Sequence, residues 1–308
     1  IGLWSDQWYK MHQKIFRDSF YTKNPIILYN DHADFQQTNA ISGEIGVGTG
    51  GVTEALRNRV IFPFTMTNQQ TWHVLGHELV HAFQYDVVIN GDSSSIKNLQ
   101  NLPLWMVEGL AEYLSLGRVD PFTAMWMRDA VLQGDVPGFK QLENPRYFPY
   151  RYGQAFWAFL AGMYGDDVIR PMFVNTAIYG IETASAITLG VTADQLSERF
   201  QNALRTYYDP FLGDKKERLI GRELVSAKNG GRINVSPVLS PNGKYIIFLS
   251  EKDLFSTDLY LADATSGKII RKVLSTTKEG HLDDLNYLES SGTWSSDSKQ
   301  FATIAYKK

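Results

Sequence analysis

The sequence predicts an α+β protein with two parts, a mainly helical N-terminal domain that carries a small mixed sheet and a C-terminal antiparallel β segment. Within residues 1–213, long stretches of helical periodicity follow a few short β-branched runs. Within residues 214–308, short alternating segments are separated by Asn-Gly and Ser-Gly turns, which is typical of hairpins. A chain of 308 residues that is 44% hydrophobic is long enough for two domains and a sizeable packed core.

The N-terminal domain is predicted to contain helices over residues 4–20, 68–86, 102–117, 152–165 and 193–208. The apolar run at 25–29 predicts a buried strand. The run at 59–64 predicts a second strand, which Pro63 favours at the edge of the sheet because proline cannot donate to a central ladder. The glycine-rich stretch at 43–51 is not followed by the Lys-Ser/Thr pair of a phosphate-binding loop, so we expect a flexible loop there.

The C-terminal segment contains an internal repeat. Its positions Ser236, Ser240, Asn242 and Lys244 recur 55 residues later as Ser291, Ser295, Asp297 and Lys299, which predicts two copies of one turn. A propeller closes with about four to eight four-stranded blades. The segment has room for one to two propeller-like blades, and we expect the natural protein to continue beyond it.

The composition excludes several classes of function. With 30 basic and 33 acidic residues the formal charge is only -3, so we expect no nucleic-acid partner and no attraction to an anionic membrane surface. The absence of cysteine excludes disulfides, thiolate metal ligands and a cysteine nucleophile. The longest apolar helical stretch, at 155–165, is too short to span a bilayer. No signal peptide is recognisable at Ile1, so one has been removed or was never included.

The stretch HVLGHELVH at 73–81 carries three histidines at intervals of four residues. A helix rises about 1.5 Å per residue, so His73 and His81 lie too far apart to bind one ion together. The pairs 73/77 and 77/81 are equivalent by spacing. Glu78 selects the second pair, because a carboxylate directly after the first ligand can take a proton from metal-bound water, as in H-E-x-x-H. His73 is expected to pack or to support a ligand.

A catalytic zinc site needs a third protein ligand. The predicted helix at 102–117 offers Glu108 and Glu112, four residues apart among apolar neighbours. Acidic side chains in such surroundings are usually paired or metal-bound if they are buried. Solvated glutamates on an outer face are the alternative.

The combination of HELVH with WMVEGLAEY at 105–113 resembles the gluzincin zinc peptidases, the thermolysin-like and aminopeptidase-like clan, over residues 25–210. The resemblance implies a zincin-type metallopeptidase domain over residues 1–213. It also implies that His77, His81 and Glu108 bind one zinc ion, that Glu78 is the general base, and that Glu112 orients a ligand histidine through a hydrogen bond.

The resemblance extends to two further features of such peptidases. The segment that begins RYGQAF at 151–156 is similar to the one that supplies an oxyanion-binding tyrosine, which points to Tyr152. A packing role for Tyr152 stays open, as do Tyr147 and Tyr150 for the oxyanion. The family's substrate-binding edge strand would correspond to residues 50–64. Glu54 is only a faint analogue of the group that holds a free N-terminus, so an endopeptidase is favoured over an aminopeptidase.

The C-terminal segment resembles a blade of the TolB-like β-propellers that follow peptidase domains in bacterial proteins, with Asn242 where such blades usually have aspartate. This resemblance implies a secreted or periplasmic protein and a possible protein partner at the propeller segment. We therefore expect zinc-dependent hydrolysis of a peptide or protein. The alternatives are a non-catalytic module that binds a protein or cell-wall ligand, and a zinc hydrolase of non-peptide substrates.

Overall fold

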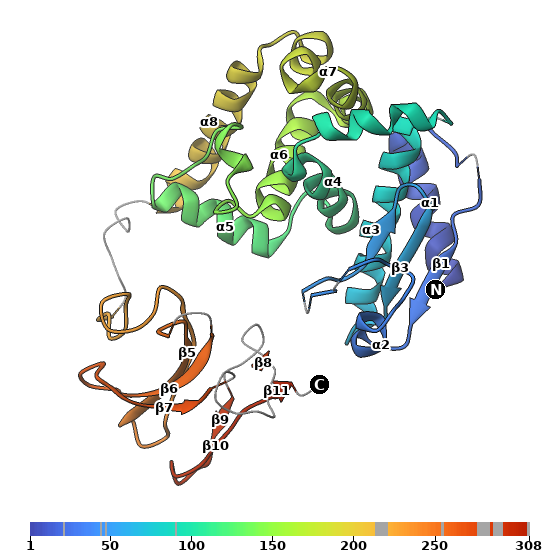
Figure 1. Ribbon diagram of the computed structural model, residues 1–308. Helices are drawn as coiled ribbons and strands as arrows, with labels where there is room; N and C mark the ends of the chain where they lie inside the picture. Colours follow the sequence, from blue (N-terminus) through green and yellow to red (C-terminus); the bar gives the residue numbers. More distant parts are fainter. Residues whose placement is uncertain are drawn as a thin grey trace. The chain divides into compact units, whose positions relative to one another are not determined.

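The computed structural model describes residues 1–306 except 21, 44, 47, 90, 213–220, 254–255, 276–283 and 286–291. The chain divides into two compact units, Ile1–Lys216 and Glu217–Lys308 (Figure 1). The expected boundary between residues 213 and 214 falls outside the described residues. Helices dominate the first unit and strands the second, so the fold is α+β as the sequence predicts.

A three-stranded mixed sheet forms the strand-bearing part of the first unit. Its order is β1 (Ile26–Tyr29), β3 (Arg59–Pro63), β2 (Val52–Glu54), with β1 parallel and β2 antiparallel to β3. The expectation of an edge strand at 59–64 is wrong, because β3 is the central strand. Pro63 is the last residue of β3, where a ladder donor is no longer needed, and Val60, Ile61 and Phe62 are fully buried. The edge strands of this sheet are β1 and β2.

Most helices of the first unit contribute to one main hydrophobic core, although the buried Phe35 of the short helix α2 lies outside it. The helices of the unit, in chain order, are α1 (Gly2–Phe16), α2 (His32–Gln36), α3 (Asn68–Ile89), α4 (Leu104–Leu116), α5 (Pro121–Leu132), α6 (Pro149–Tyr164), α7 (Ile169–Leu189) and α8 (Ala193–Leu212), with short 3-10 helices η1 (Ser93–Asn101), η2 (Gln141–Glu143) and η3 (Asp166–Val168). Helices α2, α5 and α7 were not expected from the sequence pattern. Figure 1 shows α3 between the sheet, which lies on one side of this helix, and α4, which lies on its other side.

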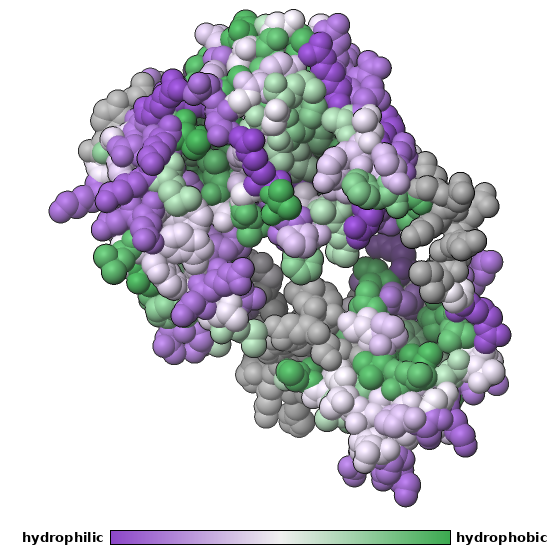
Figure 2. All heavy atoms as spheres, turned by 180° about the vertical axis from the view of Figure 1, so that it is seen from behind, coloured by the Kyte–Doolittle hydropathy of each residue, from purple (hydrophilic) through white to green (hydrophobic). Residues whose placement is uncertain are grey.

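The second unit contains a four-stranded antiparallel sheet in the order β4 (Asn234–Leu239), β5 (Tyr245–Ser250), β6 (Asp258–Asp263), β7 (Ile269–Leu274). Two short pairs lie beyond it, β8 (Asp284–Leu285) with β11 (Ala305–Tyr306), and β9 (Thr293–Trp294) with β10 (Phe301–Ala302). Figure 2 shows hydrophobic residues gathered on the visible face of this unit.

The two copies of the repeated turn make the same hydrogen bonds. The Ser240 hydroxyl donates to Asn242 Oδ1 at 2.8 Å, and the Ser295 hydroxyl donates to Asp297 Oδ1 at 2.6 Å. Each serine Oγ also accepts from the backbone N–H five residues on, at 2.9 Å in both copies. The internal repeat is therefore structural at these positions, while Ser291 lies outside the described residues.

Across the described residues, no helix combines the length and the hydropathy that a membrane span requires.

Candidate metal centre

The HELVH stretch lies in the middle of α3, where the helix is deeply buried. His77, Glu78 and His81 are between 5% and 8% exposed. Directly before His77, Gly76 makes room for the indole of Trp8 on α1, because a Cβ at this position would lie 2.5 Å from the ring. The glycine inside the helix thus lets α1 pack closely against α3 behind the two histidines.

A pair of glycines brings α4 and α6 together. Gly109 directly follows Glu108, and a Cβ on it would lie 2.2 Å from the backbone of Gly153 in α6. Only residues without a side chain permit so close a crossing of two helices. The crossing fixes Glu108 on α4 relative to the first turn of α6, which carries Tyr150 and Arg151.

Three ligand atoms converge between α3 and α4. The Nε2 atoms of His77 and His81 lie 3.1 Å apart, and Glu108 Oε2 lies 3.2 Å from the first and 3.4 Å from the second. In a tetrahedral site with bonds of about 2.05 Å, two ligand atoms are about 3.3 Å apart. The triangle therefore matches one face of such a tetrahedron, and the three residues could hold a metal ion.

Gln84 fixes the tautomer of His81. Its amide nitrogen donates to the carbonyl of Val107 at 2.9 Å, so the amide oxygen faces His81 Nδ1 at 2.8 Å and can only accept. His81 therefore carries its proton on Nδ1 and presents a lone pair at Nε2, as a metal ligand must. Gln84 is not among the site residues expected from the sequence, although its position three residues after His81 places it on the same face of α3.

Glu112 supports the other histidine. Its Oε1 accepts from His77 Nδ1 at 3.0 Å, and its Oε2 accepts from Arg151 at 3.1 Å. Arg151 also contacts Asp120 at 3.3 Å. Although burial favours its neutral form, the Glu112 carboxyl has its pKa lowered to about 2 by hydrogen bonds with His73 and His77. Glu112 is therefore held as a carboxylate in the position that the sequence analysis gave it, and Arg151 is an additional partner that the sequence analysis missed.

The carboxylates of Glu108 and Glu112 stabilise a positive charge on His77. Burial favours neutral His77, but hydrogen bonds with Glu108 and Glu112 outweigh burial and raise the pKa of His77 to about 10. Burial also disfavours an ionised Glu108, yet hydrogen bonds with both histidines hold its pKa far below the usual range. In the absence of a metal ion, a proton on His77 supplies the cation that the two carboxylates stabilise.

His73 belongs to a second cluster, His73, His77 and Glu112, which could also hold a metal ion. His73 Nε2 lies 3.3 Å from Glu112 Oε1, the same oxygen that faces His77 Nδ1. This cluster would use the opposite nitrogen of His77 and would displace the hydrogen bond between His77 and Glu112. His73 is also the more exposed histidine, with 27% of its side chain accessible.

Glu78 is held beside the triad of His77, His81 and Glu108 by the edge strand β2. The Thr53 hydroxyl lies 2.6 Å from Glu78 Oε2 and 2.9 Å from the Glu78 carbonyl oxygen, and it can donate to either. Gly51, directly before β2, leaves room for the carboxylate, because a Cβ there would lie 2.7 Å from Glu78 Cγ. The glycine-rich stretch thus ends in a close contact with Glu78.

Of the three candidate tyrosines, the structure brings Tyr150 to the triad. Its ring stacks on His77 with centroids 5.9 Å apart, and burial together with Glu108 raises its pKa. Tyr152 packs instead against Tyr147 and Trp126, with ring centroids 5.5 Å and 6.3 Å away. The side chains of Tyr150 and Tyr152 leave α6 in different directions, since they are two positions apart on a helix.

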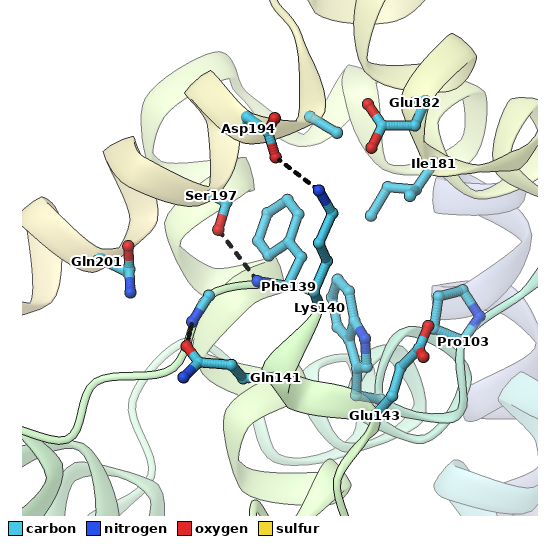
Figure 3. Close-up of a pocket in the computed structure, with 13 residues that line it drawn as sticks. Pro103, Phe139, Lys140, Gln141, Glu143, Ile181, Glu182, Asp194, Ser197 and Gln201 are labelled. Carbon is cyan, nitrogen blue, oxygen red and sulfur yellow. Dashed lines mark hydrogen bonds and ion pairs between the residues drawn. The ribbon is translucent and has the colours of Figure 1, made fainter.

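A separate cavity of about 290 Å³ lies among α4, η2, α7 and α8. Figure 3 shows Lys140 extending toward Asp194, whose carboxylate lies 3.5 Å from the lysine nitrogen. Trp105 and Phe139 supply apolar walls. None of the residues of the metal centre lines this cavity.

No model of a known protein family matches the chain, and no curated protein matches it at a significant level. The chemistry of the site is therefore inferred from its own geometry.

Proposed function

We propose that the protein is a zinc-dependent peptidase of the gluzincin type, with His77, His81 and Glu108 as the metal ligands. The observation that carries the proposal is the triangle of two Nε2 atoms and one carboxylate oxygen, with edges of 3.1–3.4 Å. Two imidazoles and one carboxylate suit zinc, and a set of three protein ligands leaves the fourth position open for chemistry. A binding module without activity would have no need for a buried carboxylate beside that position.

A zinc ion bound there would polarise the carbonyl of the scissile bond and acidify a water molecule. Glu78 accepts the proton of the attacking water and returns it to the departing amine. Thr53 and Gly51 keep the Glu78 carboxylate in place for this transfer. Glu112 and Gln84 hold the two histidines with their Nε2 atoms toward the open position.

Tyr150 is proposed as the donor to the oxyanion, in place of Tyr152. Its ring lies against His77. Burial and the nearby negative charges of Glu108 and Glu78 raise the pKa of its hydroxyl. The raised pKa of Tyr150 keeps the phenol protonated near neutral pH, so it is able to donate. The edge strand β2 offers backbone groups to an extended peptide beside Glu78, which favours internal cleavage of a polypeptide.

The second unit is proposed to be part of a TolB-like β-propeller. Its four-stranded antiparallel sheet and its repeated turn support this reading. On this proposal the segment binds a protein partner, and the protein works outside the cytoplasm, as such peptidases do.

The test combines zinc content with peptide cleavage. The wild-type protein is loaded with zinc, its metal content is measured by elemental analysis, and a broad peptide library is digested and read by mass spectrometry. We expect one zinc ion per chain and cleavage, with the rate falling about 10²–10⁴-fold in Glu78→Gln while zinc stays bound. A protein that holds no stoichiometric zinc would contradict the metal assignment. A zinc-loaded protein that leaves the library uncut would instead favour a non-peptide substrate or a binding module.

A further inference from the structure

The cavity among α4, η2, α7 and α8 is separate from the candidate metal centre, and none of the proposed metal ligands lines it. Its volume of about 290 Å³ lies near the lower end of the range of about 300–1,000 Å³ that is usual for small-molecule sites. The cavity therefore has room for a small organic molecule, and the character of its lining indicates which kind.

Hydrogen bonds hold one wall of the cavity in place. This wall is the loop that precedes η2, and α8 holds it at two points. The backbone N–H of Phe139 donates to Ser197 Oγ at 3.0 Å, and the amide of Gln201 donates to the carbonyl of Val136 at 2.8 Å. The wall is therefore formed before any ligand binds, as is usual for small-molecule sites.

Two aromatic side chains supply the apolar part of the lining. Trp105 and Phe139 are 1% and 8% exposed, and their ring centroids lie 5.3 Å apart. The indole N–H of Trp105 donates no hydrogen bond to any part of the chain that the structure describes. Because a buried donor without an acceptor costs free energy, a ligand that brings an acceptor atom to this N–H would be stabilised.

The charged part of the lining consists of three carboxylates and one lysine. The lysine, Lys140, pairs with Asp194 at 3.5 Å, and the two side chains are 82% and 80% exposed, so the pair is weak. Glu143 and Glu182 form no ion pair with any residue among those described. Figure 3 shows their carboxylates turned toward the cavity, one from η2 and the other from α7. The cavity thus presents two carboxylates that have no cationic partner in the described part of the chain.

We infer that this cavity is a binding site for a small organic cation, an amine attached to a flat apolar body that also carries a hydrogen-bond acceptor. The apolar body packs on Trp105 and Phe139, and the ammonium group faces Glu143 and Glu182. The acceptor takes the hydrogen bond that the indole of Trp105 can donate. The inference goes beyond the proposed peptidase function, because the cavity contains none of the groups that would cut a peptide bond. Its test measures binding alone.

The test compares three ligands of similar shape by isothermal titration calorimetry with the whole chain. On the same hydroxyphenyl body, tyramine carries an ammonium group, tyrosol a neutral hydroxyl group and hydroxyphenylpropanoate a carboxylate. We expect tyramine to bind with a Kd of about 1 mM or tighter and tyrosol about three- to tenfold more weakly, with the carboxylate weaker still. Absence of tyramine binding, equal binding of the three ligands or a preference for the carboxylate would overturn the assignment.

Two double variants test whether the cation binds at the two free carboxylates. Glu143→Gln with Glu182→Gln removes both carboxylates at exposed positions, and we expect the affinity for tyramine to fall about three- to tenfold. Glu198→Gln with Glu223→Gln is the matched control. It changes the net charge equally at exposed positions that do not line the cavity, and it should change the affinity less than about twofold. Equal losses in the two double variants would show that net charge alone attracts tyramine.

A second measurement locates the bound ligand. The chain has 7 tryptophans, so the indole N–H region of a nitrogen–proton correlation spectrum is simple, and Trp105→Phe identifies the peak of Trp105. We expect tyramine to shift this peak saturably and further than the peaks of the other tryptophans. A titration that leaves the Trp105 peak in place while another indole peak moves would put tyramine elsewhere on the protein and overturn the inference.

Discussion

Two clusters that share His77 differ in what they offer a metal ion. In the first, Nε2 of His77 meets His81 and Glu108 in a triangle with edges of 3.1–3.4 Å. In the second, Nδ1 of His77 and Nε2 of His73 both face one oxygen of Glu112. Both clusters could hold a metal ion, but in the first cluster one ion could bind two Nε2 atoms and a carboxylate oxygen without breaking the hydrogen bond between His77 Nδ1 and Glu112, whereas in the second cluster it could not.

The difference shows that the groups behind a histidine decide which of its nitrogens is available. Gln84 accepts a hydrogen bond from Nδ1 of His81, and Glu112 accepts one from Nδ1 of His77. Both rings therefore turn Nε2 toward Glu108. His73 instead turns Nε2 toward Glu112, and its buried Nδ1 has no hydrogen-bond partner among the described residues. Spacing makes the three histidines equivalent, and their neighbours on α3 and α4 remove the equivalence.

The largest expected effect comes from removing a ligand of the first cluster. His81→Ala leaves two ligands, and we expect zinc affinity to fall by about 10³-fold or more, since a three-ligand set is needed for a catalytic site. The measurement is competition for zinc against a chromophoric chelator. His73→Ala is the matched control on the same helix and should change the affinity less than about threefold, because His73 contacts Glu112 and the ring of His77 but is not part of the first cluster. Loss of zinc in His73→Ala together with retention in His81→Ala would show that the second cluster, and not the first, binds the zinc ion.

His12, a third buried histidine, has a pKa that is shifted in the opposite direction from that of His77. His12 is almost fully buried and donates from its ring to the carbonyl of Gly76, with no carboxylate partner. Burial lowers the pKa of His12 from 6.5 to about 4, whereas carboxylates raise that of His77. Because the unfolded chain binds a proton at His12 below pH 6.5 and the folded chain does not until about pH 4, the stability contributed here is lost as the pH falls through this window.

The expected loss from His12 is roughly 3 kcal/mol of unfolding free energy between pH 7 and pH 4, at about 1.4 kcal/mol for each unit of pKa. Urea denaturation of the metal-free protein at several pH values measures it, with the His12→Gln variant as reference because glutamine does not titrate. The difference between the two proteins should shrink or change sign toward pH 4. A difference that is constant with pH would show that His12 titrates normally in the folded state.

Smaller effects are expected when the groups that orient the ligands are changed. Glu112→Gln and Gln84→Ala should each weaken zinc binding by about 10–100-fold, because they leave the ligands present but free to turn. Glu112→Gln should have the greater effect, since Arg151 and His73 also lose their charged partner. Chelator competition distinguishes the two. Equal affinity in wild type and both variants would mean that backbone packing alone orients the rings.

Much of the site follows from local sequence. The interval between His77 and His81 places both rings on one face of a helix, and Glu78 is fixed by its position after the first ligand. Glu108 and Glu112 are separated by one helical turn, so the two carboxylates meet α3 at different levels. The structure places Glu108 Oε2 beside the Nε2 atoms of the two histidines and Glu112 Oε1 beside Nδ1 of His77.

The parts that sequence could not predict depend on contacts between distant segments. Gly109 and Gly153 act together only because α4 and α6 cross at their backbones. That crossing decides that Tyr150 and not Tyr152 reaches His77, a choice that spacing within α6 leaves open. The central position of β3 is a similar case, because Pro63 suggests an edge unless its place at the end of the strand is known.

The most direct test of the account is anomalous diffraction from crystals of the zinc-loaded protein, recorded at the zinc absorption edge. The account predicts one peak within bonding distance of Nε2 of His77, Nε2 of His81 and a carboxylate oxygen of Glu108, at about 2.0–2.2 Å from each. A peak bonded instead to Nδ1 of His77, together with His73 and Glu112, would contradict it.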